Sequence, residues 1–423
     1  MLVPDIIEQH WEEAGLLWAR RNLATRNPAF SLVTLAELDE RLEAHLDGLR
    51  ISGPEGWDLC MQVAQWEDPG EAFTAGVLTL ETGAESQFMT LVKRAEANPA
   101  LVRGFASALG WAEPALARET IHTLLAADSS VLRRIGCTGA ALHRLPLNGE
   151  LAGMLHNTDA LLRARACRAV GELAQTQLAS ALRANLEAEP VSFWAAWSLA
   201  LLGSDAGSLG RLRQFLAEAG PLGNRATQML FRRMEPTTAL ACQKELARNP
   251  DQFRLAICAA AAMGDPALIP WLLERMAAPE TLRPAADAFQ TITGADFVME
   301  RLRNGSPPRP PVPEDTGLEY QPDPDADLVW PNPDAIRKWW EQHRSQFSPG
   351  SRYLLGKPIS AECLQNALRE GRQHQRAAAA LELAIRNPGQ PLFNIAAPAY
   401  RQSALLAHAP AAAPASGKPQ TAR

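Results

Sequence analysis

The stretch GSRYLLGKPIS, from Gly350 to Ser360, is the part of the sequence closest to a phosphate-binding loop. Such a loop needs four residues between its glycines and then Lys followed by Ser or Thr, because its backbone N–H groups surround the phosphates. Here five residues separate Gly350 from Gly356, and Pro358 follows Lys357 and removes one N–H donor. We therefore interpret this stretch as a basic connecting loop rather than a nucleotide site.

The other residue types that commonly do chemistry are scattered along the chain. The eight histidines show neither an HExxH motif nor a spacing with cysteine that suits a metal. The six cysteines contain no CxxC pair, and no GxSxG motif is present. We therefore expect no catalytic residue, no metal and no cofactor. The cysteines are expected to be buried and reduced, which is typical of a cytoplasmic protein.

Two tryptophans and a set of arginines are the best candidates for recognition, since both residue types are enriched in binding hot spots. Trp194 and Trp197 are three residues apart on one expected helix and share a face of it. Aligning the similar segments described below by their starts puts both tryptophans in a core column. Aligning the segments by their ends puts the tryptophans over Arg165 and Arg168, on an exposed concave side. Both alignments stay open, and the candidate partner-binding residues are Arg163, Arg165, Arg168, Trp194, Trp197, Arg225 and Arg254.

These candidates lie in segments that repeat with a period near thirty. Turn-forming clusters open the segments, and Pro190, Pro221, Pro250 and Pro279 are 31, 29 and 29 residues apart. A second helical stretch, such as PALIPWLLERMA, follows each segment. Two helices per unit at this period indicate an all-α solenoid, in which stacked neighbours share a continuous core. The segments are LVRGFASALG, VLRRIGCTGAAL, LLRARACRAVGEL, VSFWAAWSLALLG, LGNRATQMLFRRM, QFRLAICAAAAMG and TLRPAADAFQTITG.

The tripeptide RNP occurs three times, at 26–28, 248–250 and 386–388. Asn tolerates the left-handed conformation at a helix end, and Pro cannot continue the helix beyond it. Arg in the last turn suits the negative end of the helix dipole. We interpret RNP as a helix stop rather than a recognition motif.

Three of the segments resemble a known repeat. LLRARACRAVGEL, QFRLAICAAAAMGD and TLRPAADAFQTITG are similar to the HEAT repeat, in particular its short bilin-lyase-like variety, in which Arg precedes a pair of small residues. The resemblance covers roughly residues 73–296. It implies an armadillo-type fold whose Arg-bearing helices line the concave side, where partners bind.

Composition divides the chain into five parts. Residues 1–60 carry eleven acidic and five basic side chains, whereas 336–376 carry eight basic and three acidic ones. Because the linker between the array and the C-terminal unit is rich in Asp, we expect that it can fold back on that basic unit. The expected parts are a helical N-terminal cap (1–72), a HEAT-like array (73–303), a Pro/Asp-rich linker (304–335), a C-terminal helical unit (336–408) and a disordered tail (409–423).

The C-terminal stretches PDAIRKWWEQHRSQFSPGSRYLLGKPIS and GRQHQRAAAALELAI resemble a proteobacterial family of HEAT-containing proteins of unknown function. Genes of that family are often found near type VI secretion clusters, and the family offers no catalytic residue. The resemblance implies an accessory role in secretion, with a spike component or an effector as the partner. We therefore expect a non-enzymatic scaffold or adaptor that binds another protein.

The sequence also suggests two other functions. Some HEAT-like solenoids are DNA glycosylases, and here Arg163, Arg165 and Arg168 would hold the duplex while Trp194 and Trp197 contact the lesion. The net charge of −6 and the lack of a carboxylate in the tryptophan-bearing helix disfavour that function and any nucleic-acid partner. The second alternative, attachment of a bilin, is suggested only by the similarity of the repeats, and a shared fold does not imply a shared function.

We expect a soluble chain. It has no apolar stretch of eighteen residues, and acidic residues occupy the place where a signal peptide is basic. The oligomeric state does not follow from the sequence.

Overall fold

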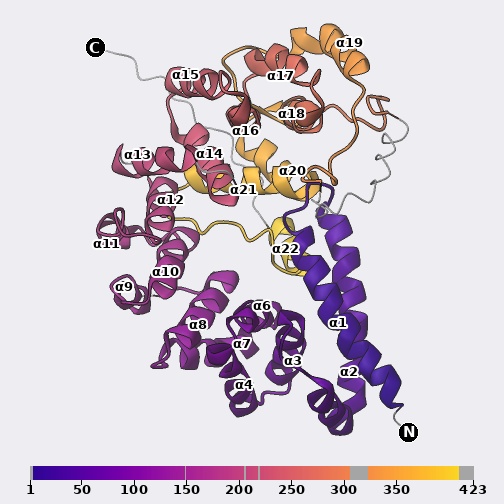
Figure 1. Ribbon diagram of the computed structural model, residues 1–423, viewed down its shortest axis with the longest axis vertical. Helices are drawn as coiled ribbons and strands as arrows, with labels where there is room; N and C mark the ends of the chain where they lie inside the picture. The colour runs from indigo at the N-terminus through magenta and orange to yellow at the C-terminus, as the bar shows by residue number, and fades with distance from the viewer. Residues whose placement is uncertain (1–2, 148, 204–205, 218–219, 305–322, 409–423) are drawn as a thin grey trace, which may run out of the picture.

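The computed structural model describes residues 3–147, 149–203, 206–217, 220–304 and 323–408. Most of these residues are helical (Figure 1), which confirms the all-α class. The strands that the described residues contain are β1 (Tyr353–Leu354) and β2 (Lys357–Pro358), which pair antiparallel. None of the helices in the described ranges is long and apolar enough to span a membrane.

The chain begins with two long helices that pack against each other, α1 (Pro4–Ala24) and α2 (Leu32–Val63) (Figure 1). Ser31 starts α2: its hydroxyl accepts a hydrogen bond from the N–H of Thr34, and the Thr34 hydroxyl accepts one from the N–H of Ser31. This reciprocal capping satisfies N–H groups that a helix start leaves unpaired. Another face of α1 is buried against α3, the first helix of the array.

Eight helices then form an inner row in which each packs against the next. Their small residues allow close approach: a side chain at Gly104 would overlap the carbonyl oxygen of Pro69, where the row begins. All seven segments expected from the sequence are helices of this row. The inner helices are α3 (Pro69–Glu81), α6 (Val102–Trp111), α8 (Ser130–His143), α10 (Ala160–Glu172), α12 (Ser192–Leu202), α14 (Pro221–Arg233), α16 (Phe253–Met263) and α18 (Pro279–Thr293).

Shorter helices form a second row on the outside of the curve (Figure 1). The two rows enclose two apolar clusters that meet at α12, with Phe105 buried in one and Phe289 in the other. The outer helices are α4 (Glu85–Val92), α5 (Arg94–Ala97), α7 (Pro114–Leu125), α9 (Glu150–Met154), α11 (Ala179–Arg183), α13 (Ala206–Gln214), α15 (Pro236–Leu246) and α17 (Ile269–Arg275). Short 3-10 turns precede or extend several helices: η1 (Pro99–Leu101), η2 (Thr176–Leu178), η3 (Phe215–Ala217), η4 (Pro250–Gln252), η5 (Pro266–Leu268) and η6 (Arg344–Gln346).

The C-terminal helices are α19 (Pro333–His343), α20 (Ala361–Glu370), α21 (Gln373–Arg386) and α22 (Ala399–Ala407). Helix α19 packs against α17 at the end of the array, and its two tryptophans meet Phe289 of α18 edge-on. Helix α21 lies inside the curve, against α12 and α14, and α22 packs against α2 (Figure 1). The chain therefore returns to its own beginning.

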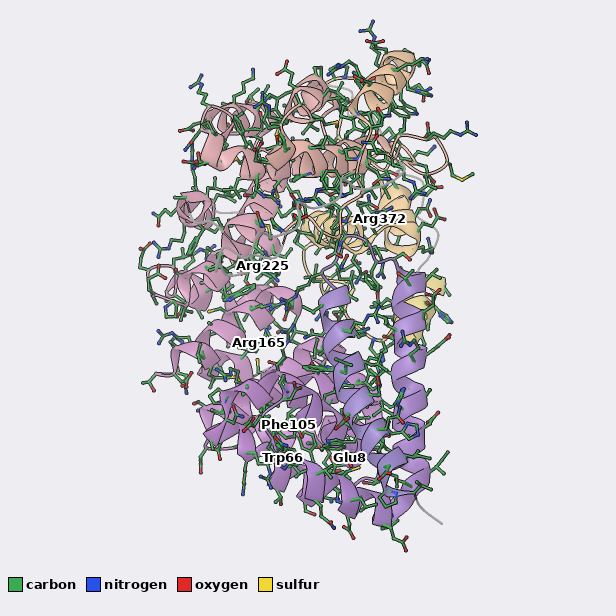
Figure 2. The ribbon with its side chains drawn as sticks, turned by 45° about the vertical axis from the view of Figure 1, so that its right-hand side comes forward. Glu8, Trp66, Phe105, Arg165, Arg225 and Arg372 are labelled. Carbon is green, nitrogen blue, oxygen red and sulfur yellow. The ribbon has the colours of Figure 1, made fainter. Side chains whose placement is uncertain are left out.

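The inner row and the C-terminal helices thus form a ring, and hydrogen bonds hold its two ends together. The N–H of Gln373 donates to the carbonyl of Phe30 at 2.7 Å, and Arg372 forms a β-bridge with Ser31. Figure 2 shows Arg372 beside the ends of the first two helices. Residues 387–398 then cross the inner row, where the N–H of Leu392 donates to the Glu172 carbonyl at 3.0 Å. The inner side of the row is thus partly covered by the chain itself.

The stretch expected to be a plain connection holds the β1–β2 hairpin, which caps two inner helices. The N–H of Tyr353 donates to the carbonyl of Gly264 at 2.9 Å, and that of Leu355 donates to the carbonyl of Thr291 at 2.8 Å. Gly264 and Gly294 end α16 and α18 with φ of 68° and 69°, a left-handed conformation that favours glycine. Sequence analysis does not detect this hairpin, because each of its strands has only two residues and is too short to show an alternating pattern.

The three RNP copies lie at or just after the ends of α1, α15 and α21, as expected, but the asparagine does not act as expected. Asn249 and Asn387 have φ of −104° and −125°, so neither is left-handed. The side chains of Asn27 and Asn249 instead accept hydrogen bonds from the N–H two residues on. These asparagines begin the turn that follows a helix rather than end the helix itself.

The linker expected at 304–335 is described at its two ends. Asp323 and Asp325 pair with Arg283 and Arg254 of the inner row, not with the basic C-terminal unit. Residues 305–322 and the tail expected at 409–423 lie outside the described residues.

Candidate functional site

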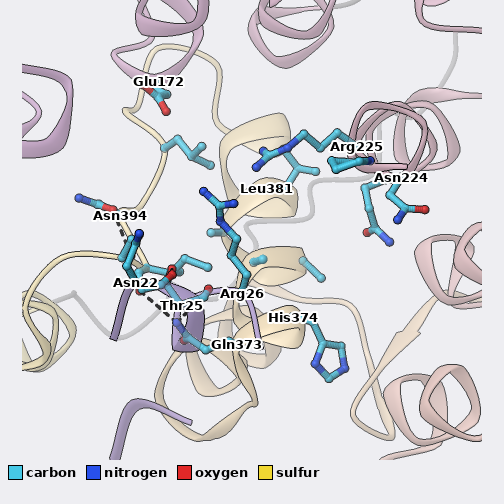
Figure 3. A pocket seen from close by; sticks show the side chains of 18 of the residues that line it. Asn22, Thr25, Arg26, Glu172, Asn224, Arg225, Gln373, His374, Leu381 and Asn394 are labelled. Carbon is cyan, nitrogen blue, oxygen red and sulfur yellow. Dashed lines mark hydrogen bonds between the residues drawn. The ribbon is translucent and has the colours of Figure 1, made fainter. Parts of the chain in front are cut away.

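A cavity of about 1060 Å³ lies at the centre of the ring. Its walls come from the inner helices, the loop after α1, helix α21 and the crossing segment 387–398 (Figure 3). Ten arginines and three carboxylates line it, so its walls carry an excess of positive charge. The arginines are Arg21, Arg26, Arg103, Arg134, Arg144, Arg165, Arg168, Arg225, Arg232 and Arg254, and the carboxylates are Glu172, Asp287 and Asp325.

Glu172 holds one group of these arginines together. It is 6% exposed, accepts a hydrogen bond from Arg165 at 2.9 Å and forms an ion pair with Arg168 at 2.8 Å. Burial alone would raise its pKa, but the charges of Arg165, Arg168 and then Arg144 lower the pKa to about 2. A carboxylate this acidic stays ionised at neutral pH and is a poor proton acceptor.

The two tryptophans have different environments. One alignment of the repeats places both in the core and the other places both on an exposed side, and neither describes both residues. Trp197 is 6% exposed, belongs to the core and contributes part of the cavity wall. Trp194 is half-buried, and its ring lies 4.6 Å from the guanidinium carbon of Arg168 and 5.6 Å from that of Arg225. Cation–π contacts of this kind stabilise by about 0.5–2 kcal/mol and hold the two arginines in place.

Five lining arginines form no ion pair with any carboxylate in the described part of the chain: Arg26, Arg103, Arg134, Arg144 and Arg225. Arg144 donates instead to the carbonyls of Leu392 and Ala141, and the pKa of Asp159 is lowered by a hydrogen bond from the N–H of Leu162 and also by the charge of Arg134. Burial, with the neighbouring charges of Arg168 and Arg26, lowers the pKa of Arg225 to about 10. Burial and the charge of Arg26 also lower the pKa of Arg103. In Figure 3 the side chains of Arg26 and Arg225 point toward each other across the cavity. These like charges repel one another, and the charge of Glu172 offsets this at Arg225 only in part.

The opposite wall of the cavity is balanced. Arg254 donates to Asp325, and His374 lies 3.2 Å from the Asp287 carboxylate. Arg232 lies 3.7 Å from Glu382, a carboxylate of α21 that also pairs with two other arginines. The unbalanced charge is therefore concentrated where the loop after α1 faces α6 and α14.

The structure brings most of the candidate residues together. Arg165, Arg168, Trp197, Arg225 and Arg254 line the cavity, and Trp194 lies beneath two of these arginines. In Figure 2, Arg165 and Arg225 are seen one above the other, on α10 and α14. Arg163 does not reach the cavity, because its side chain donates to the carbonyl of Asn157 at 2.9 Å.

Sequence analysis missed several lining residues, including Arg26, Arg103 and Glu172. Arg103 follows an apolar pair at the start of its helix, as Arg133 and Arg163 do, so the repeat pattern contains a signal for it. Arg26 was interpreted as part of a helix stop. No local sequence pattern identifies Arg26 as a lining residue. It reaches the cavity because the C-terminal helices fold back onto the start of the chain.

The cysteines and possible metal ligands add no further site. All six cysteines are free, and burial raises the pKa of Cys137 to about 11 and that of Cys167 to about 12, which disfavours thiolates. Among the described residues, no group of three or more His, Cys, Asp or Glu side chains is placed to hold a metal.

The chain was compared with known proteins in three ways. A scan against models of protein families, a search of curated proteins and a search of solved structures each gave no match. The cavity itself is therefore the basis for assigning a function.

Proposed function

We propose that this protein is a non-enzymatic binding scaffold, a HEAT-like α-solenoid that holds an anionic group of its partner in the central cavity. The observation that carries the proposal is the charge of the lining, ten arginines against three carboxylates. Arginine suits such a site because its planar group donates two parallel hydrogen bonds to an oxyanion and is weakly hydrated. An anion entering the cavity would relieve the repulsion among Arg26, Arg103 and Arg225.

Two observations favour binding over catalysis. Glu172, the carboxylate nearest the candidate arginines, is held as an anion by its neighbours and is unsuited to moving a proton. Helix α21 and residues 387–398 also lie against the inner row, where a glycosylase would need room for duplex DNA. Both observations therefore favour a binding protein over a nucleic-acid enzyme.

The C-terminal resemblance supports a partner from a type VI secretion cluster, such as a spike component or an effector. In this proposal the partner either supplies the anionic group itself or binds only when a separate anion occupies the cavity. Affinity capture of the tagged protein from its host tests the partner's identity. The expected result is a secretion-cluster protein that Arg225→Gln captures less well than wild type; equal capture by both would contradict a role for the cavity.

Calorimetric titration of the full-length protein tests anion binding itself. Three anions serve as probes: hexaglutamate, sulfate and tripolyphosphate. At least one is expected to bind with one molecule per chain, and Arg225→Gln is expected to weaken that binding. Arg248→Gln is the control, because Arg248 is exposed and lies outside the cavity. If none of the three anions binds, the proposed function is wrong.

A further inference from the structure

We propose that Arg26, Arg103 and Arg225 form a subsite for phosphate, and that its ligand is a small molecule with two or more phosphate groups. This inference rests on the proposed function and names the chemistry of the anion. Three observations support it: the side chains come from three separate elements, they form no ion pair among the described residues, and they line a cavity of suitable size.

The three arginines reach the cavity from three separate elements. Arg26 follows α1, Arg103 lies in the first turn of α6, and Arg225 is the fifth residue of α14. Guanidinium groups that converge from different directions suit a tetrahedral phosphate with three free oxygens better than a flat carboxylate with two. The geometry therefore favours phosphate over the carboxylates of Asp and Glu.

The number of unpaired charges matches more than one phosphate. A phosphate ester carries about −1.5 to −2 at neutral pH, so two of them carry about −3 to −4. Arg26, Arg103 and Arg225 contribute three positive charges, and none of them forms an ion pair with a carboxylate in the described ranges of the chain. Two phosphates thus balance the subsite, whereas a single one leaves part of its positive charge uncompensated.

The start of α14 adds to the same preference. Pro221 and Asn224, both in its first turn, line the cavity beside Arg225. The first turn of a helix presents unpaired N–H groups and the positive end of the helix dipole. It therefore supplements the three guanidinium groups and is not needed to define the subsite.

The size of the cavity favours a small molecule over a long polyanion. Its volume of about 1060 Å³ is close to that of sites for drug-sized ligands, which are about 300–1,000 Å³. Helix α21 forms one wall, and Figure 3 shows its Leu381 beside Arg26 and Arg225. An uncharged part of the ligand would contact this apolar side chain, while the phosphates face the arginines.

The test compares tripolyphosphate with hexaglutamate and sulfate in titrations of the full-length protein at one ionic strength. Tripolyphosphate is expected to bind most tightly, with one molecule per chain. Arg26→Gln and Arg225→Gln are each expected to weaken it about tenfold or more, the usual effect of losing a charged hydrogen bond. Arg26→Lys keeps the charge but not the planar fork and is expected to recover only part of the affinity.

Arg248→Gln is the matched control for Arg26→Gln. Both arginines belong to an RNP tripeptide after a helix, but only Arg26 lines the cavity. Circular dichroism and unfolding temperatures show whether each variant is folded. Arg26 is exposed, and its side chain makes no hydrogen bond to another residue that the structure describes, so its replacement is expected to leave the core intact.

Two results would overturn the phosphate subsite. One is tripolyphosphate that fails to bind while hexaglutamate binds and depends on Arg225; the proposed function then stands with a different anion. The other is tripolyphosphate that binds the wild type, Arg26→Gln and Arg225→Gln equally. If no anion binds at all, both the subsite and the proposed function are wrong.

Discussion

At the scale of residues, the two tryptophans of α12 have separate roles that substitution distinguishes. Trp197→Ala removes a buried ring and is expected to lower the free energy of unfolding by about 3–5 kcal/mol. Trp194→Ala removes a half-buried ring and two cation–π contacts, which predicts a smaller loss of about 1–2 kcal/mol. Urea unfolding measures both values. Equal losses would mean that the two rings are equally part of the core.

Glu172 gives the fold a distinctive pH dependence. Because its folded-state pKa of about 2 lies below the ordinary 4.5, its ionised form stabilises the fold above about pH 4.5. This stabilisation, on the order of 3 kcal/mol, is lost as the pH falls from about 4.5 to about 2.

Glu172→Gln removes that contribution and leaves Arg165 and Arg168 without their counter-charge. The variant is expected to be less stable than the wild type at pH 7, by about 3–5 kcal/mol. Below pH 4.5 its stability should fall less steeply. Urea midpoints measured between pH 7 and pH 2 test this, and parallel curves for the two proteins would exclude the buried ion pairs.

At the scale of elements, Gly294 connects α18 to the β1–β2 hairpin. Gly294→Ala places a side chain at φ 69° and against the backbone of Leu355, so we expect a loss of about 1–3 kcal/mol and faster hydrogen exchange in the hairpin. Gly153→Ala is the control, because it lies in helix α9 with nothing near the added carbon. A hairpin whose exchange is the same in both variants would contradict the docking.

The helices were predictable because their signal is local. The seven repeated segments follow a periodic apolar pattern between turn residues, and all of them are helical. The cavity was predictable only in part: Arg165, Arg225 and Arg254 share the pattern of their repeats, whereas Arg26 does not. Its position depends on α21 and residues 387–398 folding back onto the inner row, and no local pattern encodes such a long-range contact.

At the scale of the whole molecule, a buried ion pair joins the two ends of the ring. Arg21 and Asp39 lie 2.8 Å apart in the N-terminal helices, Arg21 donates to the carbonyls of Ala396 and Ala397, and the N–H of Ala399 donates to Asp39. This pair therefore helps to hold the C-terminal helix α22 in place.

Asp39→Ala leaves Arg21 buried without its counter-charge and is expected to cost about 3–5 kcal/mol. Hydrogen exchange should increase most in α22, because the N–H of Ala399 loses its acceptor on α2, and in residues 387–398, because Arg21, which donates to Ala396 and Ala397, loses its counter-charge. Glu40→Ala, an exposed neighbour on the same helix, serves as the control. Unchanged exchange in α22 would show that other contacts close the ring.

The central claim is that the ring keeps unpaired arginines for an anion, and unfolding temperature tests it most directly. At low salt without the anion, Arg26→Gln is expected to melt at or above the wild type, since one repelling charge is gone. With tripolyphosphate at a hundred times its dissociation constant, the wild type gains about 2.7 kcal/mol and should melt higher than Arg26→Gln. We expect this gain of the wild type over Arg26→Gln only when the anion is present; a wild type that melts higher than Arg26→Gln in both conditions would contradict the anion site.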